Sequence, residues 1–274
     1  MKLFIFLSLF LIIQGCSFKP FEVTTITIKG SDSMLPLTEN LAQEYMKLNP
    51  GISIYVYGGG TGIGIKSLIN GEIDICTASR NLKPDEAKSL ADYYGSVGVF
   101  YLIAKDALSI YVNRYNPVKN LSLEELKNIF KCDITDWSKI GGKHQVIIPV
   151  TRNVNSGTYY FFQEHVLNGE EYCEDAVVEA TTSEIIEFVE KNENAIGYGS
   201  FGIKGNIAFA KIDGFEPSEK NIQNDTYPLT RYLHFFTTQV PKGNIKKFID
   251  WVLSPEGQKI IKDSGYIPLW DVSQ

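Results

Sequence analysis

The hydrophobic positions of this chain alternate between a spacing typical of strands and a spacing typical of helices. Apolar or alternating runs at residues 23–29 and 52–57 predict two strands. Between them, apolar residues recur every three or four positions, at Leu37, Leu41, Tyr45 and Leu48. That stretch is therefore predicted to be a helix, which ends at the Pro50-Gly51 pair.

The same alternation continues to the C-terminus. Further strands are predicted at residues 73–77, 108–112, 146–150, 195–198, 207–212 and 232–237. Further helices are predicted after Gly62 and after Pro84, and at residues 123–130, 159–166, 183–191, 244–253 and 255–264. Residues 213–228, with two prolines and a polar run, are predicted to be a loop. Strands that alternate with helices predict parallel sheets flanked by helices, in which ligands bind beyond the carboxyl ends of the strands.

The N-terminus has a different pattern. Met1 and Lys2 precede eleven residues without a charge, and Gly15 stands directly before Cys16. This run is too short to span a membrane and is typical of a signal peptide, which we assign to residues 1–15. A small residue before a cysteine resembles the lipidation site of bacterial lipoproteins, so Cys16 is the expected lipidated residue, with an ordinary signal peptide and a chance cysteine as the alternative.

Composition narrows the functional classes. Of 274 residues, 44% are hydrophobic and 21% are charged, and 26 basic side chains face 32 acidic ones. These values are typical of a globular protein, and the net charge of -6 without a basic run argues against nucleic-acid binding.

Polar turns follow several of the predicted strands. Three of them are rich in Gly, Ser and Thr, and a fourth carries Arg80. Such turns direct backbone N–H groups, hydroxyls and helix N-termini toward one place, which favours an anion. Arg80 and Arg152 both follow strands, where a guanidinium can hold a tetrahedral oxyanion through two hydrogen bonds. Each turn alone is better explained as a tight turn with a helix cap, because glycine-rich turns before helices are common.

Other catalytic and binding motifs are absent from the sequence. Lys66-Ser67 follows Ile65 rather than a glycine, so there is no nucleotide-binding loop, and the residues around Ser200 do not form a GxSxG motif. The three histidines are scattered, without the spacing of metal ligands. We therefore predict no metal, no cofactor and no enzymatic activity.

Three cysteines remain after Cys16, at positions 76, 132 and 173, and none forms a C-x-x-C pair. A disulfide between Cys132 and Cys173 and three buried thiols are both compatible with this spacing.

Taken together and in order, the turns are similar to those of phosphate-binding lipoproteins, a branch of the periplasmic binding proteins that deliver phosphate to ABC importers. The resemblance covers nearly all of the chain after Cys16. The motifs that carry it are Gly30-Ser31-Asp32-Ser33-Met34, Gly58-Gly59-Gly60-Thr61-Gly62, Ala78-Ser79-Arg80, Arg152 with Ser156-Gly157-Thr158, and Gly265-Tyr266-Ile267-Pro268.

The resemblance implies an α/β fold of two lobes, with mixed, mostly parallel sheets flanked by helices and joined by two hinge strands. Lobe I would combine residues 22–106 with 234–274, and lobe II would be residues 107–233. The hinge strands are expected near residues 107–113 and 227–236.

The resemblance also implies a function and its residues. We expect high-affinity binding of inorganic phosphate between the lobes and delivery to the permease subunits of an ABC importer. The protein would be a monomer, exported and anchored by lipid to the periplasmic or extracellular face of a bacterial membrane. The expected phosphate-binding residues are Asp32, Ser33, Met34, Thr61, Ser79, Arg80, Arg152, Ser156, Gly157 and Thr158.

One departure concerns selectivity. In some members of the family an Asp follows the serine of the third motif and accepts the proton of bound phosphate, which excludes sulfate, whereas this chain has Arg80 there. Asp32 is the candidate acceptor, and a helix N-cap is its alternative role. The competing functions are binding of another tetrahedral oxyanion such as sulfate, phosphate sensing or adhesion on the same scaffold, and a phosphatase.

Overall fold

The computed structural model describes residues 23–270 and residue 272 of the 274-residue chain. The predicted signal peptide at residues 1–15 and the predicted lipidation site Cys16 lie outside the described residues. In the part that the structure describes, no helix is long and apolar enough to cross a membrane.

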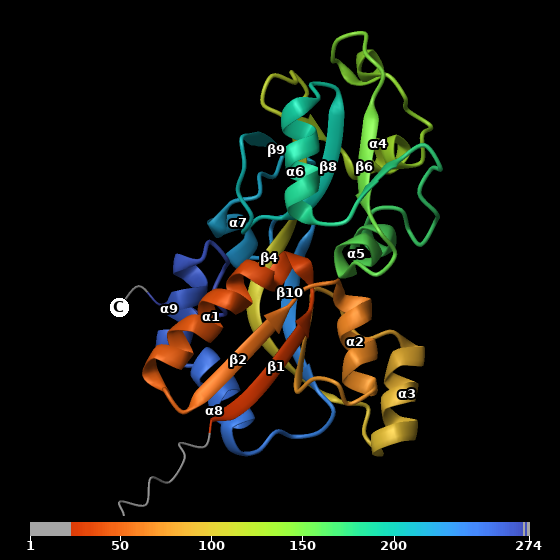
Figure 1. The fold of residues 1–274 in the computed structure, drawn as a ribbon. Coiled ribbons are helices and arrows are strands. Elements are labelled where there is room, and N and C mark those ends of the chain that lie inside the picture. The colour runs from red at the N-terminus through yellow and green to blue at the C-terminus, as the bar shows by residue number, and fades with distance from the viewer. Residues whose placement is uncertain (1–22, 271, 273–274) are drawn as a thin grey trace, which may run out of the picture.

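A single mixed sheet organises the molecule, in the order β2-β1-β3-β10-β4-β8-β6-β7; off this path, β9 pairs with β4 and β5 pairs with β9. The helices cover its faces (Figure 1). The strands are β1 (Thr24–Gly30), β2 (Ile52–Tyr57), β3 (Ile75–Ala78), β4 (Val99–Asn113), β5 (Asn120–Leu121), β6 (Ile148–Arg152), β7 (Val177–Glu179), β8 (Ala195–Ser200), β9 (Ile207–Ile212) and β10 (Thr230–Thr237).

Nine α-helices and two 3-10 helices connect or follow the described strands. They are η1 (Asp32–Met34), α1 (Leu35–Leu48), α2 (Thr61–Ile69), α3 (Pro84–Tyr94), α4 (Leu123–Phe130), η2 (Trp137–Ile140), α5 (Gly157–His165), α6 (Thr182–Lys191), α7 (Glu219–Gln223), α8 (Gly243–Val252) and α9 (Pro255–Asp263). Residue types near the helix ends explain several boundaries: a capping box of Ser122 and Glu125 begins α4, and the hydroxyl of Ser254 caps α9.

β4 and β10 run antiparallel through the middle of the molecule. The first part of β4 pairs with β10, from Val99 opposite Thr237 to Ala107 opposite Thr230, and its second part pairs with β8 and β9. Figure 1 shows β1, β2, α1 and α8 on one side of this central pair and β6, β8, α4 and α6 on the other. The carboxyl ends of β1, β3 and β6 all point toward the middle, where their turns meet.

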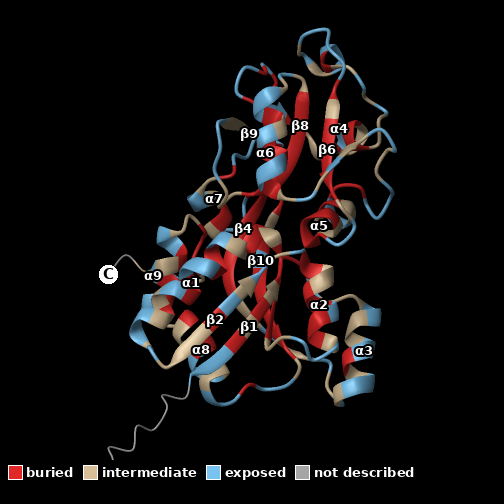
Figure 2. Ribbon diagram, viewed as in Figure 1, coloured by how far each residue is buried: buried red, intermediate tan, exposed pale blue. Residues whose placement is uncertain are grey.

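Two large apolar cores lie on the two sides. One contains Ile26 and Ile28 of β1 and the predicted helix face of Leu37, Leu41 and Tyr45. The other is built around Phe130, Trp137 and Phe162. In Figure 2 the buried residues follow the central strands and the inner faces of the helices.

Two sequence predictions were wrong in detail. The strand predicted at residues 108–112 is longer and begins at Val99. Its first part was missed because Lys105 and Asp106 interrupt the apolar pattern, although both side chains are buried and form ion pairs. The loop predicted at residues 213–228 contains α7, which is capped by Ser218 and is too short for helical periodicity to be visible in the sequence.

The cysteine question left open by the sequence is resolved. Cys132 and Cys173 form a disulfide, and Cys76 is a buried free thiol. The disulfide links the end of α4 to the segment before β7.

Candidate functional site

Three serines meet at the centre of the molecule: Ser31 and Ser33 in the turn after β1, and Ser79 after β3. Ser31 N donates to the Thr77 carbonyl at 2.9 Å, which holds the turn against the end of β3. The Ser31 hydroxyl lies 2.9 Å from the Ser33 hydroxyl and donates to the Ser79 hydroxyl at 3.1 Å. The side chains of Ser31, Ser33 and Ser79 are all buried.

The N-termini of two helices meet beside these hydroxyls. Thr61, the first residue of α2, accepts a hydrogen bond from Ser79 N at 3.3 Å. Gly157, the first residue of α5, lies so close that a Cβ there would be 2.4 Å from Thr61 Oγ1 and 2.6 Å from Ser79 Oγ. A residue larger than glycine does not fit between them. The positive ends of both helix dipoles therefore point at the same cluster of hydroxyls.

α5 owes its position to local capping and to one contact across the molecule. The Ser156 hydroxyl accepts hydrogen bonds from Thr158 N and Tyr159 N, as an N-cap does. The Asn155 carbonyl accepts a hydrogen bond from Gly62 N of α2 at 2.9 Å. Ser156 thus orders the helix end, and its hydroxyl is engaged by the helix itself.

Arg152, at the end of β6, reaches across to the β1 turn. Its Nη2 donates to Asp32 Oδ2 at 2.7 Å and to the Ala180 carbonyl at 2.6 Å, and its Nη1 donates to Thr182 Oγ1 at 3.2 Å. Its Nε is buried and has no hydrogen-bond partner in the described residues. Arg152 therefore keeps its Nε–H for a further acceptor.

Asp32 has a role that differs from the N-cap considered from sequence. Its Oδ1 accepts a hydrogen bond from Gly59 N at 2.6 Å, and its Oδ2 accepts the Arg152 guanidinium. The cap of η1 is Ser31 and the cap of α1 is Met34, neither through a side chain. Asp32 joins the β1 turn to the turn before α2 and to β6.

Arg80 is close to the cluster but directed away from it. Its two terminal nitrogens both donate to the Glu86 carboxylate, each at 2.7 Å, and Nη1 also donates to the Asn81 carbonyl. Only Nε is buried without a partner. The bidentate oxyanion contact expected for Arg80 from sequence is therefore occupied by Glu86 in this structure.

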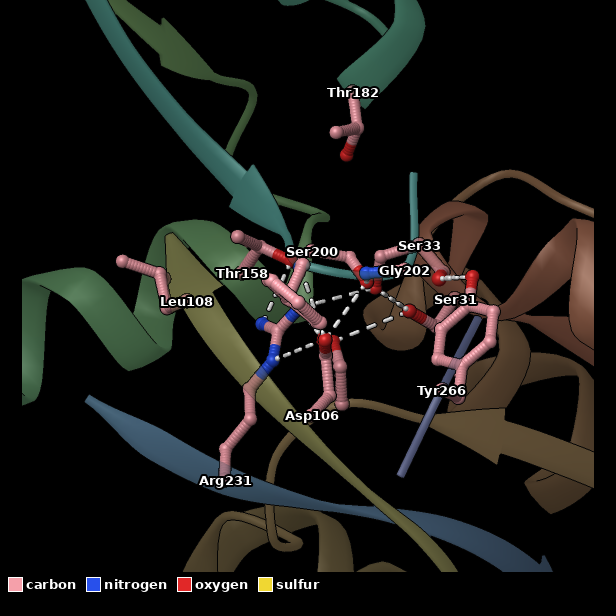
Figure 3. Close-up of polar contacts among 12 residues, drawn as sticks. Ser31, Ser33, Asp106, Leu108, Thr158, Thr182, Ser200, Gly202, Arg231 and Tyr266 are labelled. Carbon is pink, nitrogen blue, oxygen red and sulfur yellow. Dashed lines mark hydrogen bonds and ion pairs between the residues drawn. The ribbon is translucent and has the colours of Figure 1, made fainter. Parts of the chain in front are cut away.

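Sequence reasoning missed a third arginine. Arg231 of β10 and Asp106 of β4 form an ion pair in which both side chains are 1% exposed. Figure 3 shows this pair next to Thr158, Ser200, Ser33 and Tyr266. The sequence feature that could have indicated this ion pair is the presence of one charge in each of two otherwise apolar strands, Asp106 in β4 and Arg231 in β10.

Tyr266, in the motif Gly265-Tyr266-Ile267-Pro268, also belongs to this region. Its hydroxyl donates to the Ser33 carbonyl at 2.8 Å. Burial raises the pKa of Tyr266 well above its ordinary value, so the hydroxyl stays protonated and keeps this hydrogen bond to the β1 turn.

The electrostatic character of the cluster comes from dipoles rather than from net charge. Each arginine is paired with a carboxylate: Arg80 with Glu86, Arg152 with Asp32, and Arg231 with Asp106. What remains for a ligand are hydroxyls, backbone N–H groups at helix N-termini and the two unpartnered Nε atoms. This donor set is suited to an oxyanion.

A cavity of about 540 Å³ adjoins the cluster, and Ser79 and Arg231 line it. Four consecutive aromatic residues lie in α5. Tyr160 and Phe161 line this cavity, whereas Tyr159 and Phe162 are buried in the fold. Among the residues that the structure describes, no group of three or more His, Cys, Asp or Glu side chains is arranged to hold a metal ion.

The fold and the cluster together define an α/β binding protein with an anion-type site where helix N-termini meet between two sides of one sheet. Residues 19–256 match the model of a PBP superfamily domain. The chain belongs to this family.

Curated relatives and solved structures agree with this assignment. The chain is 33% identical over 254 residues to "Phosphate-binding protein PstS" of Bacillus subtilis (strain 168), covering 90% of this chain and 82% of the relative. It is 30% identical over 264 residues to the protein of the same name from Pseudomonas aeruginosa, covering 88% and 81%. A putative phosphate ABC transporter substrate-binding protein from Clostridium perfringens, solved with bound phosphate, superposes with a TM-score of 0.84 at 32% identity, covering 90% of this chain and all of that one. An ABC-type phosphate transport receptor from Vibrio cholerae gives 0.74 at 32% identity, covering 88% and 99%.

Proposed function

We propose that this protein binds inorganic phosphate in the buried donor cluster and delivers it to an ABC importer. The observation that carries the proposal is the convergence of the N-termini of α2 and α5 on the hydroxyls of Ser31, Ser33 and Ser79. Burying a doubly charged anion is costly unless its oxygens are paired, and a set of hydroxyl and N–H donors meets that need. The relatives named for phosphate binding support the same ligand.

In this proposal each predicted residue has a definite contribution. Ser33, Thr61, Ser79 and Thr158 donate hydroxyl protons, and the N–H groups of Asp32, Ser33 and Gly157 donate from the turns. The N–H groups of Met34 and Thr158, which the sequence also suggested, already donate to the Ser31 carbonyl and the Ser156 hydroxyl. Arg152 and Arg80 donate through Nε, and Ser156 orders the end of α5. Glu86 makes Arg80 a weaker contributor than Arg152, since it holds both terminal nitrogens of Arg80.

We propose that the two sides move as lobes, residues 22–106 with 234–274 against residues 107–233, with β4 and β10 as hinge strands. The contacts that would form on closure are the Arg152–Asp32 ion pair and the hydrogen bond from Gly62 N to the Asn155 carbonyl. Binding of phosphate between the lobes favours the closed arrangement.

Asp32 is the proposed determinant of phosphate over sulfate. A carboxylate can accept the proton of hydrogen phosphate but repels the fully ionised oxygens of sulfate. Asp32 lies beside the donor cluster, and each of its oxygens accepts one hydrogen bond from the protein and keeps a further lone pair.

The location and partners follow from the same function. We propose an exported monomer, anchored by lipid at Cys16 on the extracytoplasmic side, which docks on the permease subunits of the importer. Its role is binding and release rather than catalysis, and the absence of a nucleophile–base pair in the motifs supports this.

The test is isothermal titration of residues 17–274, freed of bound ligand, with phosphate and with sulfate near neutral pH. We expect one-to-one phosphate binding that sulfate does not compete with. Equal binding of both ions would assign a general oxyanion function, and binding of neither would refute the proposal. Incubation with a phosphate ester should release no phosphate, whereas turnover would indicate a phosphatase.

A further inference from the structure

Arg231 stands out among the buried charges because, besides its ion pair with Asp106, it donates to a hydroxyl on each side of the molecule. It lies on β10 with 2% of its residue surface exposed, and it connects both sides of the molecule. Its Nη1 donates to Thr158 Oγ1 at 3.0 Å, and its Nη2 donates to Ser33 Oγ at 3.4 Å (Figure 3). These hydroxyls stand at the N-terminus of α5 and in the turn after β1.

The direction of these hydrogen bonds fixes where the hydroxyl protons go. A guanidinium has five donors and no acceptor, so both hydroxyl oxygens must accept from Arg231. Each hydroxyl proton is then left for a different acceptor. Thr158 Oγ1 has no other hydrogen-bond partner in the described part of the chain, and the neutral Ser31 hydroxyl is the alternative acceptor for Ser33. An anion in the cluster can accept the Thr158 proton, and it is a stronger acceptor for the Ser33 proton than the neutral Ser31 hydroxyl.

Asp106 holds the guanidinium in this orientation. Its Oδ2 accepts from Nε at 3.1 Å and from Nη2 at 2.9 Å. Its Oδ1 accepts from Ser200 Oγ at 2.9 Å and from Phe201 N at 3.1 Å. Both carboxylate oxygens are therefore engaged, and the carboxylate acts on Arg231 rather than on a ligand.

We propose that Arg231, oriented by Asp106, is a positioning residue of the anion site that directs the hydroxyl protons of Thr158 and Ser33 toward the bound oxyanion. The inference rests on the proposed function, because it needs a tetrahedral oxyanion in the cluster. Arg231 also couples the two sides of the site, since one side chain sets the donor direction of a hydroxyl on each.

The experiment is a double-mutant cycle measured by titration with phosphate and, in parallel, with sulfate. Thr158→Val removes the hydroxyl and keeps the side-chain shape, and Thr158→Ser is its matched control. Asp106→Asn combined with Arg231→Gln removes both buried charges together, because leaving either one alone would endanger folding. Thermal unfolding of each variant establishes that it folds, and Arg114→Gln, at an exposed arginine, is the control for loss of a positive charge.

We expect Thr158→Val to weaken phosphate binding by about 10- to 100-fold in the otherwise unchanged protein. The folded Asp106→Asn/Arg231→Gln variant should bind phosphate at least about tenfold more weakly than the unchanged protein. In that background, adding Thr158→Val should weaken phosphate binding by less than about threefold more, because Arg231 no longer directs the Thr158 hydroxyl proton toward the anion. Unchanged affinity in the folded double variant, or full additivity of the two changes, would overturn the inference while leaving phosphate binding intact. If the unchanged protein binds neither ion, the proposed function and this inference fall together.

Discussion

Arg152 and Asp32, which are 120 positions apart in the sequence, form an ion pair of 2.7 Å between the end of β6 and the turn after β1. Arg152 is almost fully buried and Asp32 is largely so. One residue comes from each side of the central strands. The pair therefore joins the two sides at the edge of the proposed anion site.

Arg152→Ala should weaken phosphate binding by about 100-fold or more, because it removes an N–H donor to the anion and leaves the Asp32 carboxylate without its partner. Isothermal titration measures the change. Arg114→Ala, at an exposed arginine that follows β4 and donates to Asn206, should bind as the unchanged protein does. Unchanged affinity in Arg152→Ala would remove Arg152 from the site.

Arg80→Ala should affect stability more than binding. Both terminal nitrogens of Arg80 are held by Glu86, so its loss leaves a largely buried carboxylate unpaired and lowers the free energy of unfolding by about 3 kcal/mol. The phosphate Kd should rise by less than about tenfold, which is less than in Arg152→Ala. Urea unfolding and titration of the same variant give the two values. A loss of binding equal to that of Arg152→Ala, with stability retained, would instead make Arg80 a direct ligand.

Gly157→Ala should abolish tight binding, because the added Cβ would lie 2.4 Å from Thr61 Oγ1 and would force α5 away from α2. Gly62→Ala is a graded control, since its Cβ would lie 3.3 Å from the Asn155 carbonyl and needs only a small shift. Titration with phosphate should therefore show a large loss for the first variant and a small one for the second. Comparable losses would contradict the close approach of the two helix N-termini.

Replacing both Cys132 and Cys173 by Ser should lower the free energy of unfolding by about 3 kcal/mol, because the disulfide closes a loop across a sequence separation of 41. Phosphate affinity should not change, since neither residue contacts the anion site. Urea unfolding and titration separate the two effects. Cys76→Ser, at the buried free thiol, shows the effect of a Cys→Ser change without a disulfide.

Stability should fall on acidification partly through His234. Burial lowers the pKa of His234 from its ordinary value to about 4. Between about pH 6.5 and pH 4 the unfolded chain binds a proton at this position and the folded chain does not, so the unfolding free energy decreases as the pH falls, by about 3 kcal/mol in total. His234→Gln should flatten this part of the urea-unfolding profile, and His165→Gln, at a more exposed histidine, should not. Identical profiles for the unchanged protein and His234→Gln would refute the assignment.

Local signals in the sequence were sufficient for most elements of the fold. The spacing of Leu37, Leu41 and Tyr45 predicted the buried face of α1, and the helix predicted at residues 123–130 has the bounds of α4. The early part of β4 was missed because Lys105 and Asp106 look exposed in a sequence, and only distant residues neutralise them. Lys105 pairs with Asp225 and Asp106 pairs with Arg231.

By itself the sequence determined the strand–turn–helix order, the polar turns and the residue types suited to an anion, because these depend on neighbours within a few positions. The tertiary structure decided which of those side chains face one another. It turned Arg80 toward Glu86, joined Arg152 to Asp32, and placed Arg231 between Ser33 and Thr158. The direction of a long charged side chain is set by partners brought near through the pairing of β4 with β10 and the approach of α5 to α2, and no local pattern encodes those contacts.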